Sequence, residues 1–229
     1  MYWNEEKKPE ARYQVPDDIV DLAFAITCPR LPIEHAHELS TALMEALPWL
    51  EEDEDAGIHL IHGAESGNGW YRPEDPVNQV LHLSRRARMR IRIANRRIED
   101  AQALTGKTLD ISGHELVVGK SAVQMLSTLP TQFSRYVICP EDDSEEVFLD
   151  FIHAGLLEME IDCRKILCGK THVIDMPDRP VFTRSVMLAD LEPEESVRLQ
   201  QMGLGDGRKF GCGLFSPHKG IKAVREENE

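Results

Sequence analysis

The spacing of apolar and polar residues in the first half of the chain predicts a mixed order of strands and helices. Alternating apolar residues predict strands, and apolar residues three to four positions apart predict helices. The predicted strands lie at 18–27, 57–63, 80–93 and 109–119, the last turning at Ser112-Gly113, and the helices lie at 32–47 and 95–104. The order is βαββαβ, that of a ferredoxin-like domain.

The same order recurs in the second half, after a connector at 121–130. Strands are predicted at 133–139, 163–174, 180–189 and 210–215, and helices at 144–159 and 193–202. The fold class predicted is therefore α+β, with two tandem ferredoxin-like (RRM-like) βαββαβ domains. Their expected bounds are 1–122 and 123–229, and each is long enough to form its own core.

The strand at 80–93 carries an unusual run of charge. Seven arginines and no acidic residue lie between positions 85 and 97. The residues Arg86, Arg88, Arg90 and Arg92 alternate with Ala87, Met89, Ile91 and Ile93. This period of two predicts one face on a core and one face of guanidinium groups. Such a face repels itself unless an anion joins it, and arginine suits phosphate, so we expect Arg85 and these four arginines to bind RNA or DNA. The alternative is an ordinary solvated face.

A glycine-rich segment at 203–213 precedes the last predicted strand. It repeats a Gly-apolar-Gly unit around a five-residue spacer that holds Arg208 and Lys209. So many glycines predict a loop whose amides face an anionic ligand rather than a packed segment. The spacing fits neither a P-loop nor a dinucleotide fingerprint, because no helix follows. A flexible hairpin without a ligand is the alternative.

The doubled glycine unit resembles the glycine-rich loop of the RAMP superfamily of CRISPR-associated proteins, specifically its repeat-cleaving, guide-RNA-processing endoribonucleases. The resemblance implies two tandem ferredoxin-like domains, a basic surface for RNA and a loop before the final strand. The implied RNA-binding residues are the arginines above together with Gly203, Gly205, Gly207, Arg208, Lys209, Gly211 and Gly213.

The resemblance also implies a chemistry. Members of this family cleave RNA without a metal ion or cofactor, by attack of the 2′-hydroxyl on the adjacent phosphate. They commonly carry a histidine in or just before the first helix, which here means His35 or His37, with His35 the better match. If Ala36, Leu39 and Leu43 form the buried stripe of that helix, both histidines lie beside it and neither belongs to the core. No tyrosine matches the additional residue that many members carry.

Other histidines are weaker candidates. His59 and His62 fall on opposite faces of a predicted strand, which argues against a shared metal. His82 begins half of a two-histidine phosphoesterase signature whose second half is missing. His218 follows the last predicted strand and could reach the glycine-rich loop.

Composition limits the location and the partners. The chain has a net charge of −14 and five scattered cysteines without zinc-ligand spacing. No apolar run is long enough to span a bilayer, and the N-terminus lacks a secretion signal, so we expect a cytoplasmic protein with reduced thiols. The acidic total indicates RNA binding on one face, or acidic faces that meet basic subunits of a CRISPR effector complex.

The sequence leaves three functions open. The first is an endoribonuclease that cleaves CRISPR repeat RNA in precursor transcripts, leaving a 2′,3′-cyclic phosphate and a 5′-hydroxyl. The second is a non-catalytic subunit that binds guide RNA in an effector complex. A nucleotide-binding regulatory domain that uses only the glycine-rich loop is third, and it leaves the arginines unexplained.

Overall fold

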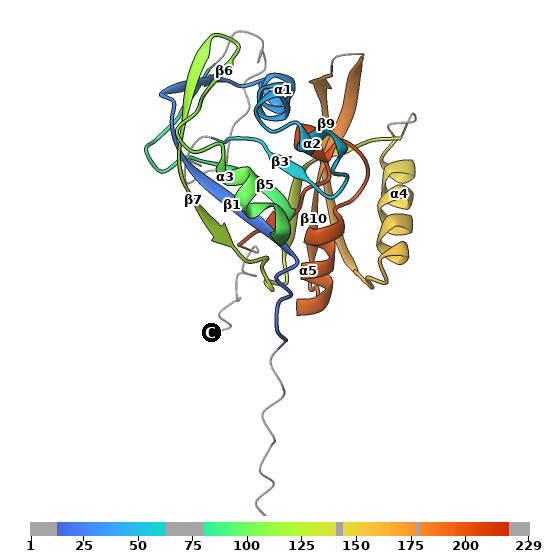
Figure 1. The fold of residues 1–229 in the computed structure, drawn as a ribbon. Coiled ribbons are helices and arrows are strands. Elements are labelled where there is room, and N and C mark those ends of the chain that lie inside the picture. Colours follow the sequence, from blue (N-terminus) through green and yellow to red (C-terminus); the bar gives the residue numbers. More distant parts are fainter. Residues whose placement is uncertain (1–12, 63–79, 141–143, 177–178, 220–229) are drawn as a thin grey trace, which may run out of the picture.

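The structure, a computed structural model, describes residues 13–62, 80–140, 144–176 and 179–219 (Figure 1). Gly63, the predicted end of one strand, lies outside the described residues. None of the described helices is both long and apolar enough to cross a membrane.

The first unit is an antiparallel sheet with helices on one face. Its strands follow the order β3-β5-β1-β7-β6. The elements are β1 (Ile19–Thr27), β2 (Arg30–Pro32), α1 (Ala36–Ala46), α2 (Trp49–Glu52), β3 (Gly57–His59), β4 (Val80–His82), β5 (Arg88–Ala94), η1 (Asn95–Arg97), α3 (Ile98–Gln102), β6 (Thr108–Ile111) and β7 (His114–Gln124). The short strands β2 and β4 pair separately.

The second unit repeats this arrangement. Its elements are β8 (Gln132–Ile138), α4 (Glu145–Glu158), β9 (Lys165–Asp175), β10 (Pro180–Ala189), α5 (Pro193–Met202), η2 (Arg208–Phe210) and β11 (Ser216–Pro217). The strand order is β11-β8-β10-β9. In both units the first strand lies between the third and the last, which is the ferredoxin-like order, so the predicted fold class is confirmed. The division at 122/123 stays a prediction; β7 runs to Gln124 and β8 begins at Gln132.

Several predicted elements differ in extent. The strand at 80–93 is two strands, β4 and β5, separated by a turn at residues 85–86, so Arg86 is not part of the arginine strand. The predicted helix at 32–47 begins only at Ala36, because Pro32 still pairs with Val80 in the small sheet. The predicted last strand at 210–215 is wrong: none of these residues is in a strand, and the strand that joins the sheet follows them at Ser216–Pro217.

Each unit has its own core. In the first, Met89, Ile91 and Ile93 of β5 are fully buried, which confirms the alternation read from the sequence. In the second, Phe148 and Ile152 of α4 pack in one cluster with residues of the sheet. Figure 1 shows α4 on the side of this sheet that faces away from the first unit.

The opposite face of the first sheet meets the second unit at β1 and β5, while its β7 side stays exposed. Arg92 is fully buried there, next to Asp21, its partner in the register of β1 and β5. Its Nε donates to Asp21 Oδ1 at 2.8 Å and its Nη2 to Asp21 Oδ2 at 3.0 Å. The third donor, Nη1, reaches the carbonyl oxygen of Gln200 in α5 at 2.7 Å. One side chain therefore links the two units.

We expect Arg92→Ala to lower the free energy of unfolding by about 3–5 kcal/mol, because it leaves the Asp21 carboxylate buried without its main partner. Urea unfolding followed by circular dichroism measures the change. Arg164→Ala is the matched control, because its side chain is 86% exposed and its ion pair with Asp162 lies on the surface. A loss below about 1 kcal/mol for Arg92→Ala, the range of a surface pair, would contradict the structural role.

Candidate functional site

His35 is a buried residue and not a surface one. It is the residue before the first turn of α1, with 2% of its surface exposed. Its Nδ1 lies 2.8 Å from the carbonyl oxygen of Pro32 and 3.0 Å from that of Ile33, and its Nε2 accepts the amide hydrogen of Ile61 at 3.1 Å. The expectation that His35 lies outside the core is wrong, because helical spacing does not govern a residue at the cap. Both ring nitrogens are already used.

His37 lies in the first turn of α1 and is only partly buried. Its ring stacks on Phe210 of η2, with centroids 6.4 Å apart and an angle of 26° between the planes. Within the described residues its buried Nδ1 has no hydrogen-bond partner. The ring lines a groove of about 410 Å³ together with Thr41, Ser112 and the carboxylates of Glu38, Glu45 and Asp110. His37 thus has a free ring nitrogen next to the glycine-rich loop.

The glycines of the loop are required by its conformation and its packing. All five have positive φ, between 66° and 82°. A Cβ on Gly211 would lie 2.5 Å from Leu60 Cγ, and one on Gly203 would lie 2.6 Å from the carbonyl oxygen of Gly213. The expectation that these glycines do not serve packing is therefore wrong, since the loop is pressed between the two units.

Most loop amides bond inside the protein. The amide of Leu204 donates to Gly213 and that of Gly213 to Tyr136 in β8. Within the described residues, the amides of Gly205, Asp206 and Gly207 donate no hydrogen bond. These three residues line a depression of about 410 Å³ that Phe210 also borders. Among the described residues, the amides of Arg208 and Lys209 are also without a hydrogen bond, so free donors gather at the loop tip. Phe210 borders this depression and stacks on His37.

The two basic residues of the loop hold the units together. Arg208 donates through Nη2 to the carbonyl oxygen of Asp55 at 2.9 Å and of Gln201 at 3.0 Å, and Nη1 donates to Met202. Burial lowers the pKa of Arg208 to about 10. Lys209 Nζ donates to the carbonyl oxygen of Glu51, at the end of α2. The expectation that both charges are presented to a ligand at the tip is not supported by these contacts.

The arginine strand divides into three parts. Arg85, Arg86 and Arg88 are exposed, Arg90 is half-buried, and Arg92 is fully buried. Arg90 Nη1 lies 3.8 Å from Asp21 Oδ2. At this end of β5, the negative charge that balances the arginines is the carboxylate of Asp21. The prediction that Arg92 contacts RNA is therefore wrong. For the exposed arginines, RNA binding stays a prediction.

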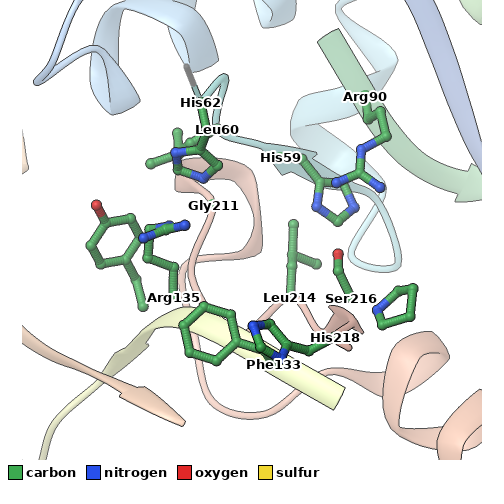
Figure 2. A pocket seen from close by; sticks show the side chains of 12 residues that line it. His59, Leu60, His62, Arg90, Phe133, Arg135, Gly211, Leu214, Ser216 and His218 are labelled. Atoms are coloured by element: carbon green, nitrogen blue, oxygen red, sulfur yellow. The ribbon is translucent and has the colours of Figure 1, made fainter. Parts of the chain in front are cut away.

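A partly open cavity of about 180 Å³ lies between the units (Figure 2). Figure 2 shows His59, His62 and Arg90 of the first unit opposite Arg135, Phe133 and His218 of the second. The remaining lining residues are Leu60, Tyr136, Gly211, Leu214, Ser216 and Pro217. None of the described residues that line it is acidic.

Sequence reasoning missed most of this cavity. His59 and His62 line it together because β3 ends at His59, so strand alternation does not separate them. Arg135 and Tyr136 both face it because the pairing of β8 with β10 is shifted between Arg184 and Val186, as in a β-bulge. The available signal was an arginine in the middle of the predicted strand 133–139.

Residues 20–220 match the family model described as "Cas6 Crispr". The chain belongs to the Cas6 family. A CRISPR-associated endonuclease Cas6 from Myxococcus xanthus (strain DK1622) is 27% identical over 198 residues, which cover 86% of this chain and 81% of that protein. The prediction of a CRISPR-associated endoribonuclease from the glycine-rich loop is thereby confirmed at the level of the family.

Solved structures support the fold. A CRISPR-associated protein Cas6 aligns with a TM-score of 0.59 at 11% identity, over 88% of this chain and 100% of that one. A Cas6-related protein from Pyrococcus furiosus gives 0.54 at 13% identity, over 86% and 98%. Cse3 from Thermus thermophilus, bound to an RNA representing a pre-cleavage complex, gives 0.51 at 11% identity, over 87% and 98%.

The buried histidines of this Cas6 protein predict an acid-sensitive fold. Burial lowers the pKa of His59 to about 4, although Asp21 opposes it, and burial lowers that of His62 to about 3, with Arg135 adding to the effect. The unfolded chain, with histidine pKa near 6.5, therefore binds protons that the folded chain does not. Stability is complete above that value and is lost as the pH falls.

We expect the free energy of unfolding to fall between pH 6.5 and 4 by about 1.4 kcal/mol per pH unit for each such histidine. Urea unfolding at a series of pH values measures the slope. His62→Gln removes one of the titrations and should flatten the slope relative to wild type. A stability that is constant over this range would contradict the neutral state of these rings.

Proposed function

We propose that this Cas6 protein cleaves CRISPR repeat RNA in precursor transcripts without a metal ion. The 2′-hydroxyl attacks the adjacent phosphorus, a new 2′-oxygen–phosphorus bond forms, and the bond to the 5′-oxygen breaks. The products are a 2′,3′-cyclic phosphate and a 5′-hydroxyl. This reaction needs a base for the 2′-hydroxyl proton, a proton for the leaving oxygen, and donors for the developing charge.

His37 is the histidine whose surroundings fit the base best. The observation that carries the proposal is its position: its ring stacks on Phe210, and its buried Nδ1 has no partner within the described residues. Histidine is the side chain most often used for proton transfer in catalysis. His35 was the better match to the family, but its Nδ1 faces the carbonyl oxygens of Pro32 and Ile33, and its Nε2 already accepts the amide hydrogen of Ile61. A proton on Nε2 would break the hydrogen bond from Ile61.

The glycine-rich loop supplies the donors next to His37. The amides of Gly205, Asp206 and Gly207 donate no hydrogen bond to any described residue, and backbone donors of this kind suit a phosphate oxygen. Carboxylates line the groove beside His37, and Glu54 and Asp206 line the depression at the loop tip, so RNA binding here depends on the loop amides and not on the local charge. The printed names of the relatives, an endonuclease and an RNA-bound Cse3, agree with an RNA substrate.

We expect His37→Ala to lower the single-turnover cleavage rate by about 10²–10⁴-fold while repeat RNA still binds. The assay uses labelled repeat RNA from the protein's own locus in EDTA, with product ends identified by mass spectrometry. His153→Ala is the matched control, because this histidine is exposed on α4, and it should cleave like wild type. His35→Ala should instead lower the free energy of unfolding by about 1–3 kcal/mol, because Ile61 and two carbonyls lose their partner.

Three results would contradict the proposal. Undiminished cleavage by His37→Ala would show that His37 is not the base. Cleavage that stops in EDTA would show that the mechanism needs a metal ion. Tight binding of repeat RNA without cleavage by the wild type would favour the non-catalytic subunit.

A further inference from the structure

The ring of His37 is not oriented by a hydrogen bond at its buried nitrogen. A histidine that transfers protons is usually held in place by a hydrogen bond from one ring nitrogen. Within the described residues, the buried Nδ1 of His37 has no such partner. Rotation of a histidine ring about its Cβ–Cγ bond is only loosely restricted by the bond itself. The orientation of this ring therefore depends on what packs against its faces.

Phe210 packs against one face of the His37 ring. The two rings are stacked, with centroids 6.4 Å apart and 26° between their planes. Aromatic pairs attract one another at centroid distances of roughly 4.5–7 Å, and the attraction depends on the angle between the rings. Both side chains are partly buried, so neither ring turns freely in solvent. The stack thus favours one orientation of the imidazole plane.

The position of Phe210 is fixed by the glycines on either side of η2. Gly207 and Gly211 are both left-handed, with φ of 82° and 80°. The amide of Phe210 donates to the carbonyl oxygen of Gly207 at 2.8 Å, which closes the turn. A Cβ on Gly211 would lie 2.5 Å from Leu60 Cγ, so this end of the turn fits closely against the first unit. The loop therefore presents the Phe210 ring at one defined place.

Two side chains attach η2 to the first unit, although η2 belongs to the second. Arg208 Nη2 donates to the carbonyl oxygen of Asp55 at 2.9 Å, and Lys209 Nζ donates to that of Glu51. The turn also contacts α1 and β3. Phe210 therefore reaches His37 across the boundary between the two units.

We propose that Phe210 is a positioning residue for His37, whose ring it holds in the orientation that accepts the 2′-hydroxyl proton. The inference rests on the proposed function, because it takes His37 to be the base. The base comes from the first unit and the ring that orients it comes from the second. Cleavage therefore requires both units in their docked arrangement.

The test separates the cleavage rate from the affinity for RNA. Phe210→Leu removes the aromatic face but keeps an apolar side chain, and Phe210→Tyr keeps the ring. We expect Phe210→Leu to lower the single-turnover cleavage rate at saturating repeat RNA by about tenfold, the range of one aromatic contact. Its Kd for repeat RNA with a 2′-deoxy nucleotide at the scissile position should stay that of wild type, and Phe210→Tyr should retain the wild-type rate. Phe182→Leu is the matched control, because Phe182 is 49% exposed on β10, and it should cleave like wild type.

Nuclear magnetic resonance of histidine-labelled protein without RNA detects the stack directly. The ring-proton resonances of His37 are assigned by their absence from His37→Gln. They should shift between wild type and Phe210→Leu and stay in place in Phe210→Tyr. Melting temperatures show whether the variants fold, and Phe210→Met takes the place of Phe210→Leu if the latter does not.

A wild-type cleavage rate for Phe210→Leu would overturn the proposal. So would a raised Kd at an unchanged rate, which would place Phe210 against an RNA base, and so would His37 resonances that are the same in wild type and Phe210→Leu. If His37→Ala cleaves like wild type, the proposed function itself fails, whatever the Phe210 variants do. Slow cleavage by both His37→Ala and Phe210→Leu, with Kd unchanged, supports both.

Discussion

The ion pair between Asp21 and Arg92 is the contact on which the arrangement of the two units depends. Burial alone would raise the pKa of Asp21, but Arg92 and His59 outweigh it and hold the pKa well below its usual range. A buried pair of this kind is costly to form and more costly to break, so it fixes a geometry more than it adds stability. Because Arg92 also bonds Gln200, that geometry includes the second unit.

The glycine-rich loop is best understood within this docked arrangement. Gly57 in β3 lies so close to Leu214 that a Cβ there would be 2.6 Å from Leu214 Cδ2. Arg208 and Lys209 then bind carbonyl groups of the first unit at Asp55 and Glu51. The loop therefore holds the two units together and places Phe210 against His37, and among the described residues its tip amides have no hydrogen-bond partner. The same glycine-rich loop therefore docks the two units and carries the amides proposed to bind RNA.

The sequence was sufficient for the architecture, since the order of elements and the core alternation of β5 follow from local periodicity. It was insufficient for the site, because periodicity says which face a side chain takes and not what covers that face. The arginine face of β5 was expected to meet RNA, yet Asp21 and α5 cover its end at Arg92. The helical pattern did not predict the burial of His35, because His35 is the N-cap residue of α1 and its ring bonds Pro32 and Ile61 outside the helix. Arg135 was missed because a bulge in β8 turns it toward the cavity.

The central claim is that His37 performs the chemistry while His35 supports the fold. A crystal structure of the protein with repeat RNA that carries a 2′-deoxy nucleotide at the scissile position tests it most directly. The account predicts the scissile phosphate beside the His37 ring and the tip amides of the glycine-rich loop, with His35 Nε2 still bonded to the amide of Ile61. A scissile phosphate beside His62 and His218, or a His35 ring released from Ile61 and turned toward the RNA, would contradict it.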